Sequence, residues 1–183
     1  MKAIFLDRDG VINKDPGFGD YVKSWEEFHF LPGAIEAIAL LTKNGYEIFV
    51  ISNQAGVSKG LYSKKTLDEI TNNMLNEIEE MGGRIRAVTY CTHAVDAGCG
   101  CRKPKIGLIK KAAKGLDIDF KNSYFIGDSE RDVKAGSCIG CKAILLLTGK
   151  ENLDDVKNWE IKPDFIKKDL MEAVIWILKE GQK

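Results

Sequence analysis

Two aspartates that follow an apolar run are the strongest candidates for a catalytic or metal-binding role in this sequence. Asp7 and Asp9 come directly after the run 4–6, and Gly10 follows them. The run predicts a buried parallel strand, and open α/β sheets bind ligands at the carboxyl ends of such strands. Alternate side chains of a strand point to opposite sides, so both carboxylates reach one site only if the backbone bends, which Gly10 permits. The pair favours Mg²⁺, which takes oxygen ligands; the alternative is a strand end with solvated acids.

Polar side chains also follow three other predicted strands. Ser52 and Asn53 end the second strand, Cys91 ends the third, and Asp128 and Asp132 follow the fourth. The carboxyl ends of parallel strands meet at one edge of a doubly wound sheet. We therefore expect these residues to converge with the two aspartates on a single site.

A second constellation contains three cysteines and a histidine. Cys91 and His93 are separated by one residue, as are Cys99 and Cys101. Three thiolates and one imidazole match a closed, tetrahedral structural Zn²⁺ site. The alternative is three buried cysteines and a hydrogen-bonded histidine, but the intervening segment 94–98 has little means of holding its own shape. We predict a structural zinc ion that folds this segment.

The predicted zinc loop ends at Arg102 and Lys103, so the metal would position this basic pair without doing chemistry itself. Cys138 and Cys141 also resemble half of a metal site, but the only other histidine is His29. We interpret these two cysteines as buried structural thiols and His29 as a loop residue.

Composition limits the function classes. The chain has 183 residues, with 27 basic and 27 acidic side chains. This length favours a single domain, 1–183, and the neutral balance gives no sign of nucleic-acid binding. No apolar run approaches a membrane span, and nothing resembles a signal peptide. We expect a cytoplasmic protein, in which cysteines bind metal more often than they form disulfides.

Strands and helices alternate along the chain. Apolar runs predict strands over 2–7, 46–52, 85–91, 123–127 and 143–148, and an edge strand over 164–167. Helical spacing predicts helices over 33–44, from 63 or 64 to 81, over 106–115, up to about 139, and over 169–179. This order indicates an α/β fold, a Rossmann-like doubly wound parallel sheet. The long segment 13–32 is expected to be either a lid over the site or a surface connection.

The motif Asp7-Arg8-Asp9-Gly10-Val11-Ile12 resembles the nucleophile motif of haloacid dehalogenase (HAD) superfamily phosphatases. Ser52, Lys103 before a helix, and the Gly-Asp-x-x-x-Asp motif at Asp128 match the other HAD motifs in order. The resemblance implies that Asp7 forms an aspartyl-phosphate and that Asp9 is the general acid and base. It also implies Mg²⁺ bound by Asp7, Asp128 and the backbone carbonyl of Asp9, phosphate oxygens held by Ser52 and Lys103, and Asp132 orienting Lys103 or the metal's waters.

The Cys-x-His and Cys-x-Cys-Arg-Lys-Pro arrangement resembles one HAD branch, the D-glycero-D-manno-heptose-1,7-bisphosphate 7-phosphatases and related histidinol-phosphate phosphatases. The similarity runs from the first strand through Lys150 and implies no large cap domain. It implies recognition of the second phosphate by Arg102, whose guanidinium can bind bidentately. The substrate-binding residues that it implies are Asp15 to Tyr21, Ser52, Asn53, Gln54, Ala55, Arg102 and Lys103.

The sequence departs from that branch at several positions. The first loop is about three residues longer than usual, Ser129 stands where lysine is common, and Thr92 and Ala94 replace a common proline and histidine. The longer loop and Ser129 bear on the substrate, whereas Thr92 and Ala94 belong to the zinc loop, which is short. In particular, Ser129 removes one expected substrate contact.

The sequence therefore predicts a Mg²⁺-dependent, zinc-stabilised phosphomonoesterase that acts on a small phosphorylated metabolite as a monomer. Heptose 1,7-bisphosphate is the favoured substrate and histidinol phosphate the alternative. A non-catalytic phosphometabolite-binding module is the rival from another class, although no residue of the expected catalytic set is missing. Trimming of DNA 3′-phosphates is disfavoured by the neutral charge.

Overall fold

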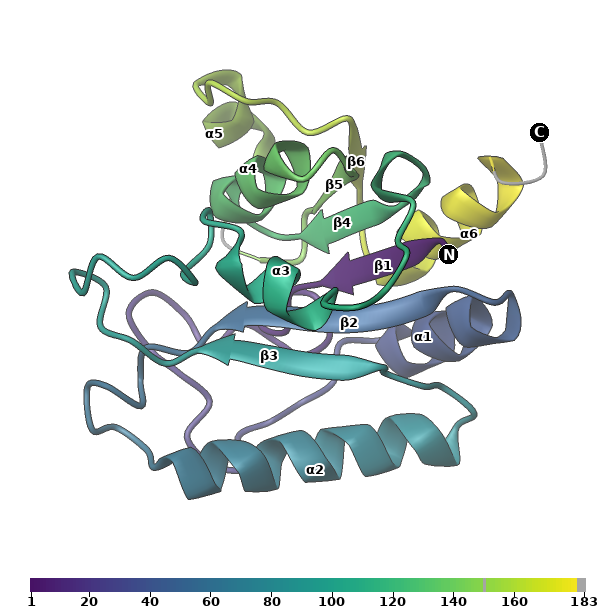
Figure 1. Ribbon diagram of the computed structural model, residues 1–183. Coiled ribbons are helices and arrows are strands. Elements are labelled where there is room, and N and C mark those ends of the chain that lie inside the picture. The colour runs from purple at the N-terminus through teal and green to yellow at the C-terminus, as the bar shows by residue number, and fades with distance from the viewer. Residues whose placement is uncertain (150, 181–183) are drawn as a thin grey trace.

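A parallel sheet of six strands forms the centre of the protein (Figure 1). The computed structural model describes residues 1–149 and 151–180, so Lys150 lies outside the described residues. The strand order is β3-β2-β1-β4-β5-β6, and every neighbouring pair is parallel. This order reverses between β1 and β4, and ligands of doubly wound sheets bind at such a reversal. The strands are β1 (Ala3–Leu6), β2 (Glu47–Asn53), β3 (Ala87–Cys91), β4 (Tyr124–Gly127), β5 (Lys142–Leu146) and β6 (Phe165–Lys167).

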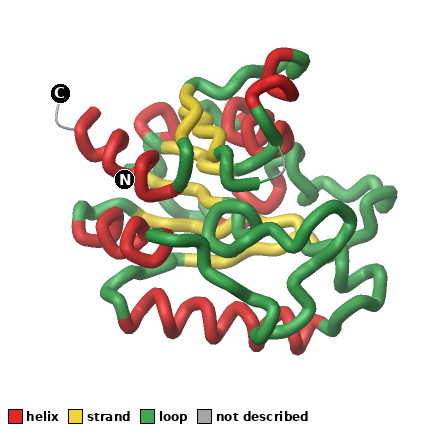
Figure 2. Tube along the Cα trace, turned by 180° about the vertical axis from the view of Figure 1, so that it is seen from behind, coloured by secondary structure: helices red, strands yellow, loops and turns green. Residues whose placement is uncertain are grey.

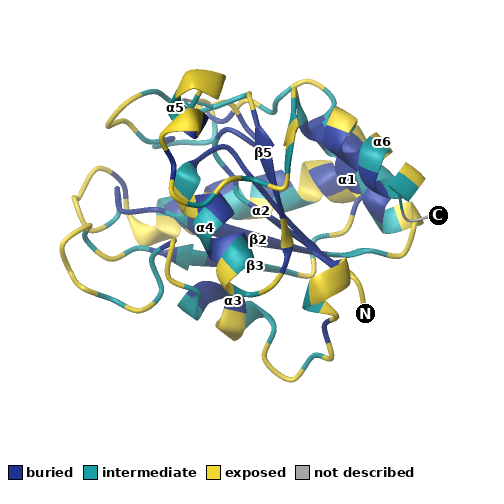
Figure 3. Ribbon diagram, turned by 90° about the horizontal axis from the view of Figure 1, so that it is seen from above, coloured by how far each residue is buried: buried dark blue, intermediate teal, exposed yellow. Residues whose placement is uncertain are grey.

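Helices cover both faces of the sheet, so alternate residues of each strand enter different cores. Ile4 and Leu6 of β1 pack in the core that includes α1 (Ala34–Lys43), α2 (Lys64–Glu80) and α6 (Leu170–Glu180). Figure 2 views this side of the molecule. Ala3 and Phe5 face the opposite core, with α3 (Gly107–Ala112) and α4 (Glu130–Cys138). Figure 3 shows the buried sheet between helices whose outer faces are exposed.

The doubly wound α/β fold predicted from the sequence is confirmed, and the expected strands and helices are found within a few residues of their predicted ends. The short helix α5 (Leu153–Lys157) and the 3₁₀ turn Phe120–Asn122 were not predicted. Both are capped by a polar side chain, Asn152 and Asp119, and they are too short to show an apolar period. None of the helices in the described part of the chain combines the length and apolar character that crossing a membrane would require.

The prediction of two buried thiols after the fourth strand is half wrong. Cys141 is buried directly before β5, but Cys138 is exposed at the end of α4. The helix packs on the sheet through Val133, Ala135 and Gly136, and Cys138 falls on its other side.

The long connection from β1 to α1 divides into two parts. Its second part is anchored by aromatic rings: Trp25 stacks on Phe28 and Phe30 meets it edge to face, with ring centroids 5.0 Å apart in both pairs. Val22 and Phe28 are buried in the core. Its first part, from Asp15 to Tyr21, lies at the carboxyl end of the sheet and lines the cavity described below.

Candidate active site

A cavity of about 570 Å³ opens at the carboxyl ends of β1, β2 and β4, at the reversal of the strand order. Its size is typical of small-molecule sites. Most of the residues proposed from the sequence line it: Asp7, Asp9, Asp15, Tyr21, Ser52, Asn53, Arg102, Lys103 and Asp128. Residues from distant parts of the chain are thus brought together as the strand ends predicted.

Three carboxylates gather at the cavity, and two of them, Asp7 and Asp128, line it. Oxygens of Asp7, Asp128 and Asp132 lie within 4.8 Å of one another. The ammonium group of Lys103 lies 2.9 Å from Asp7 Oδ2 and 2.6 Å from Asp132 Oδ1, and only 2% of its side chain is exposed. One buried cation therefore balances three carboxylates. We call Asp7, Asp128 and Asp132 the metal-side carboxylates.

The surplus negative charge changes how these groups titrate. Burial raises the pKa of Asp7 to about 6; the nearby Lys103 opposes this shift and the charge of Asp132 adds to it. Burial, together with repulsion from Asp132 and Asp7, holds the pKa of Asp128 well above its usual value. Two raised carboxyl pKa values beside one lysine indicate a place for a further cation.

The donor set fits Mg²⁺, because carboxylate oxygens are the ligands that this hard ion takes. The backbone also leaves room only for small groups here. A Cβ atom on Gly10 or Gly149 would overlap the Asp128 carboxylate. Gly10 itself has a φ of 79°, so the bend after Asp7 that the sequence required is present.

Asp9 has a different environment from Asp7. Its Oδ1 accepts hydrogen bonds from Arg8 Nη2 at 2.8 Å, Arg8 Nε at 3.2 Å and Asn13 Nδ2 at 2.9 Å, and its Oδ2 accepts one from Gln54 Nε2 at 2.7 Å. Burial alone would raise the pKa of Asp9, but Arg8 and the amide donors outweigh it, and the pKa is lowered. With its side chain held in this way, Asp9 can offer a metal its backbone carbonyl, as the resemblance implies.

Arg8 is entirely buried behind the site. Its guanidinium lies 5.8 Å from the ring centroids of both Phe28 and Tyr90. A buried arginine needs a charge partner, and Asp9 is that partner.

Two of the residues proposed as substrate contacts do not reach the cavity. Gln54 and Ala55 are fully buried and are not among the lining residues. Buried amide groups must be hydrogen-bonded, and protein groups take those of Gln54: Asp9, Ser52 and the hydroxyl of Tyr62. The side chain of Gln54 therefore contacts residues of the site itself, and its predicted substrate contact stays a prediction.

Asn53 joins the end of β2 to the basic pair. Its Oδ1 accepts a hydrogen bond from the backbone N–H of Lys103 at 3.0 Å, and its Nδ2 donates to the Lys103 carbonyl at 3.2 Å. Lys103 is thereby fixed from β2 as well as by the carboxylates. Arg102 lines the cavity, and its Nη1 is buried without a hydrogen-bond partner among the residues that the structure describes.

Asp132 is placed by the start of α4. Its Oδ2 accepts hydrogen bonds from the Ser129 hydroxyl at 2.5 Å and the Ser129 backbone N–H at 3.2 Å. This capping arrangement leaves Oδ1 for Lys103. Ser129 therefore supports Asp132, although lysine would have been expected at this position. Arg131 also lines the cavity and was not proposed from the sequence; its place in the first turn of α4, between the two aspartates of the Gly-Asp-x-x-x-Asp motif, could have indicated it.

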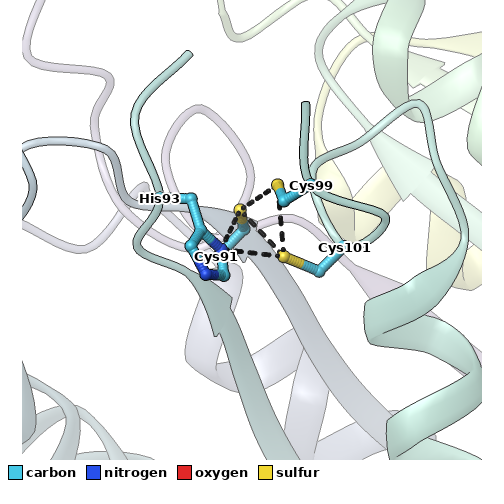
Figure 4. A group of neighbouring side chains, drawn as sticks. All are labelled: Cys91, His93, Cys99 and Cys101. Atoms are coloured by element: carbon cyan, nitrogen blue, oxygen red, sulfur yellow. Dashed lines mark hydrogen bonds between the residues drawn. The ribbon is translucent and has the colours of Figure 1, made fainter. Parts of the chain in front are cut away.

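Cys91, His93, Cys99 and Cys101 form a compact cluster (Figure 4). The thiols of Cys101 and Cys91 are 3.2 Å apart, those of Cys101 and Cys99 3.4 Å, and those of Cys91 and Cys99 3.6 Å. His93 Nδ1 lies 3.1 Å from Cys101 Sγ and 3.7 Å from Cys91 Sγ. A tetrahedral Zn²⁺ with ordinary bond lengths separates its ligand atoms by about 3.5–3.8 Å. The cluster thus needs little change to hold zinc.

The cluster is tied to the basic pair through the chain itself. Lys105 Nζ donates to the carbonyls of Gly98 and Cys99 at 3.0 and 2.9 Å, and the backbone N–H of Gly107 donates to the Gly100 carbonyl at 3.1 Å. These bonds fold the loop back onto the segment that carries Arg102 and Lys103.

Comparisons with known proteins agree with this geometry. The profile of the HAD-hydrolase-like family matches residues 100–173. The D-glycero-beta-D-manno-heptose-1,7-bisphosphate 7-phosphatase of Pseudomonas putida is 39% identical over 150 residues, which are 82% of this chain and 85% of that protein. The enzyme of the same name from Helicobacter pylori is 40% identical over 174 residues, 94% of this chain and 97% of its own.

A solved structure of D,D-heptose 1,7-bisphosphate phosphatase from B. bronchiseptica, complexed with magnesium and phosphate, superimposes with a TM-score of 0.90 at 36% identity, covering 98% of this chain and 99% of that one. The fold, the site and these matches define a HAD-like hydrolase. Within that class, the chain belongs to the D-glycero-D-manno-heptose-1,7-bisphosphate 7-phosphatase family.

Proposed function

We propose that this protein hydrolyses a phosphate monoester and that its substrate is D-glycero-D-manno-heptose 1,7-bisphosphate, from which it removes the 7-phosphate. The observation that carries the proposal is the convergence of Asp7, Asp9, Ser52, Lys103 and Asp128 on one cavity. Relatives that carry the name of this activity are 36–40% identical. The bound magnesium and phosphate of the B. bronchiseptica structure are the ligands that this chemistry requires.

In the proposed mechanism, Asp7 attacks phosphorus and forms an aspartyl-phosphate while the bond to the sugar oxygen breaks. Asp9 gives a proton to that oxygen, then takes one from the water that cleaves the aspartyl-phosphate. Lys103 and the Ser52 hydroxyl hold the transferring oxygens, because phosphoryl transfer depends mainly on positioning and charge. Asp7, Asp128 and the Asp9 carbonyl would hold Mg²⁺, and the ion would supply the positive charge that an anionic nucleophile and an anionic substrate require.

We assign substrate recognition to lining residues from three parts of the chain. Arg102 has a buried Nη1 with no hydrogen-bond partner in the described part of the chain, and its guanidinium is suited to the second phosphate. Asp15 and Tyr21 approach from the first loop and Asn53 from β2. We infer that carboxylate and phenol groups of the loop bind sugar hydroxyls.

The test is a comparison of kcat/KM on heptose 1,7-bisphosphate and on histidinol phosphate. We expect the bisphosphate to be preferred by more than tenfold. In Arg102→Ala, the loss should be about tenfold or more on the bisphosphate and small on a monophosphate, because only the former presents a second phosphate. A tenfold preference for histidinol phosphate, or equal losses in the variant, would overturn the substrate assignment.

We further propose that the chain acts as a single-domain monomer in the cytoplasm. Thiols stay reduced in the cytoplasm and so remain available to bind zinc there, and the equal numbers of acidic and basic residues give no footprint for nucleic acid. Light scattering on the zinc-loaded protein tests the monomer: a mass of twice 20.4 kDa would refute it.

A further inference from the structure

The buried side chain of Gln54 links two groups of the proposed mechanism. Its Nε2 donates to Asp9 Oδ2 at 2.7 Å and to Ser52 Oγ at 3.2 Å. Its Oε1 accepts a hydrogen bond from the hydroxyl of Tyr62 at 2.6 Å. Gln54 is fully buried and Tyr62 only 7% exposed, so water does not compete for these bonds.

The orientation of this amide is fixed by its partners. An ionised carboxylate only accepts hydrogen bonds, so the –NH₂ group must face Asp9. The Tyr62 hydroxyl then acts as the donor to Oε1. The tyrosine ring is itself packed against Gly56, where a Cβ atom would overlap it. A rotated amide would place a carbonyl oxygen against the carboxylate and leave the hydroxyl without an acceptor.

Gln54 restricts where Asp9 can carry a proton. Oδ1 of Asp9 already accepts three hydrogen bonds from Arg8 and Asn13, which leaves Oδ2 as the oxygen able to bind a proton. Gln54 fills one lone pair of Oδ2. A fifth of the Asp9 side chain is exposed, and this part lines the cavity. The remaining position on Oδ2 is therefore the one available to a leaving group.

The Gln54 amide also determines whether the Ser52 hydroxyl donates or accepts a hydrogen bond. Because Gln54 donates to Ser52 Oγ, the serine's own proton is free to be donated elsewhere. Within the described part of the chain, no residue accepts that proton. Ser52 lines the cavity, so its O–H can turn towards a phosphoryl oxygen.

From these contacts we propose that Gln54 is a positioning residue for phosphoryl transfer: it aligns Asp9 for proton transfer and Ser52 for hydrogen bonding to phosphate, and Tyr62 fixes its orientation. Gln54 acts through these two residues and does not touch the substrate. The inference rests on the proposed function, since it assigns a role within that reaction.

The experiment compares leaving groups. A sugar or alkyl phosphate needs a proton on its leaving oxygen, whereas p-nitrophenyl phosphate releases a stable anion. For Gln54→Leu we expect kcat on an alkyl phosphate to fall about 100-fold, the range of general acid catalysis, and kcat on p-nitrophenyl phosphate to fall about tenfold or less. KM should change little for both. Tyr62→Phe should show the same selectivity with a smaller loss.

Tyr124→Phe is the matched control. It also removes the hydroxyl of a buried tyrosine, but that ring packs in the core against Trp176, with the ring centroids 6.2 Å apart. We expect no leaving-group selectivity in this variant. In an Asp9→Asn background, the additional selectivity caused by Gln54→Leu should disappear, because the proton donor is already absent.

Equal losses on both leaving groups, a change confined to KM, or unchanged activity in Gln54→Leu would overturn the inference. If Gln54→Leu does not fold, as judged by thermal unfolding and zinc content, Tyr62→Phe decides by the same comparison. Wild-type protein that releases phosphate from neither substrate would refute the proposed function itself, and this inference with it. Wild-type activity with unselective variants would refute only the role of Gln54.

Discussion

Asp7 and Asp9 are two residues apart in the sequence, yet their surroundings are opposite in charge balance. Asp9 is surrounded by donors from Arg8, Asn13 and Gln54, which lower its pKa. Asp7 shares one lysine with other carboxylates, and its pKa is raised to about 6. The protein thus balances the charge of Asp9 with its own residues, whereas the charge around Asp7 is left for a bound ligand to balance.

The difference follows from how each side is built. Two of the three side chains that hold Asp9 come from the same short segment, residues 8–13, so local sequence supplies most of its partners. The metal-side carboxylates come from the ends of β1 and β4 and the first turn of α4. Only the folded sheet brings them together, and folding therefore creates repulsion there. Such repulsion is expected at a site that binds a cation, because the cation relieves it.

The largest difference between Asp7 and Asp9 should appear in enzymatic activity. We expect Asp7→Asn to lower kcat by at least about 10⁴-fold on every phosphate monoester, because the attacking oxygen is lost. Asp9→Asn should lower kcat strongly on alkyl phosphates and much less on p-nitrophenyl phosphate. Steady-state phosphate release on both substrates measures this. Residual turnover of Asp7→Asn within 100-fold of wild type would show that Asp7 is not the nucleophile.

For the stability of the fold, we expect Asp9 to matter more than Asp7, the reverse of their order in activity. Asp9→Asn leaves the buried Arg8 without its charge partner, and an uncompensated buried charge costs about 3 kcal/mol or more. Urea unfolding in magnesium-free buffer measures the change. The double variant Arg8→Met with Asp9→Asn should recover much of the loss. If Asp9→Asn alone is as stable as wild type, Arg8 does not depend on Asp9.

Removing zinc should affect the metal-side carboxylates and leave the surroundings of Asp9 unchanged. The zinc loop leads directly into Lys103, the cation shared by Asp7 and Asp132. We expect zinc-free protein in excess Mg²⁺ to lose about 10–100-fold in kcat/KM, the range seen when supporting partners of a site are removed. The loss should be equal for both leaving groups, since the contacts of Asp9 lie elsewhere. Zinc-free protein with full activity would contradict the scaffold role of the cluster.

Much of the fold and of the candidate site, but not all of it, could be predicted from the sequence. Apolar runs that end in polar residues identified the fold and the strand-end residues of the cavity, because the carboxyl ends of parallel strands converge. The resemblance to HAD phosphatases was needed for Arg102, Lys103 and the first loop. The spacing of the cysteines and His93 likewise identified a cluster that the structure assembles. The direction of the Gln54 side chain could not be predicted, because it depends on Tyr62, eight residues away on a loop without periodic pattern. The exposure of Cys138 could not be predicted either, because it depends on which side of the short helix α4 packs on the sheet.

The smallest expected effect concerns Asp128, which is only 6% exposed. Its pKa in the folded protein lies above the 3.8 of an unperturbed aspartate, chiefly because it is buried and secondly because Asp132 and Asp7 repel its charge. A carboxyl group of this kind stabilises the fold while protonated, and that stability is lost as the pH rises from 3.8 through the higher folded pKa. Asn cannot ionise, so without magnesium Asp128→Asn should be more stable than wild type at pH 8.

We expect a gain of about 1 kcal/mol, or about 3 °C in Tm, that shrinks towards pH 4. Magnesium should raise the Tm of wild type at pH 8 and leave that of Asp128→Asn nearly unchanged, which would reverse their order. Asp68→Asn, at an exposed position on α2, is the control and should respond to neither condition. A Tm of Asp128→Asn below wild type at pH 8 without magnesium would mean that the protein already satisfies this carboxylate. The metal-side carboxylates would then not differ from Asp9.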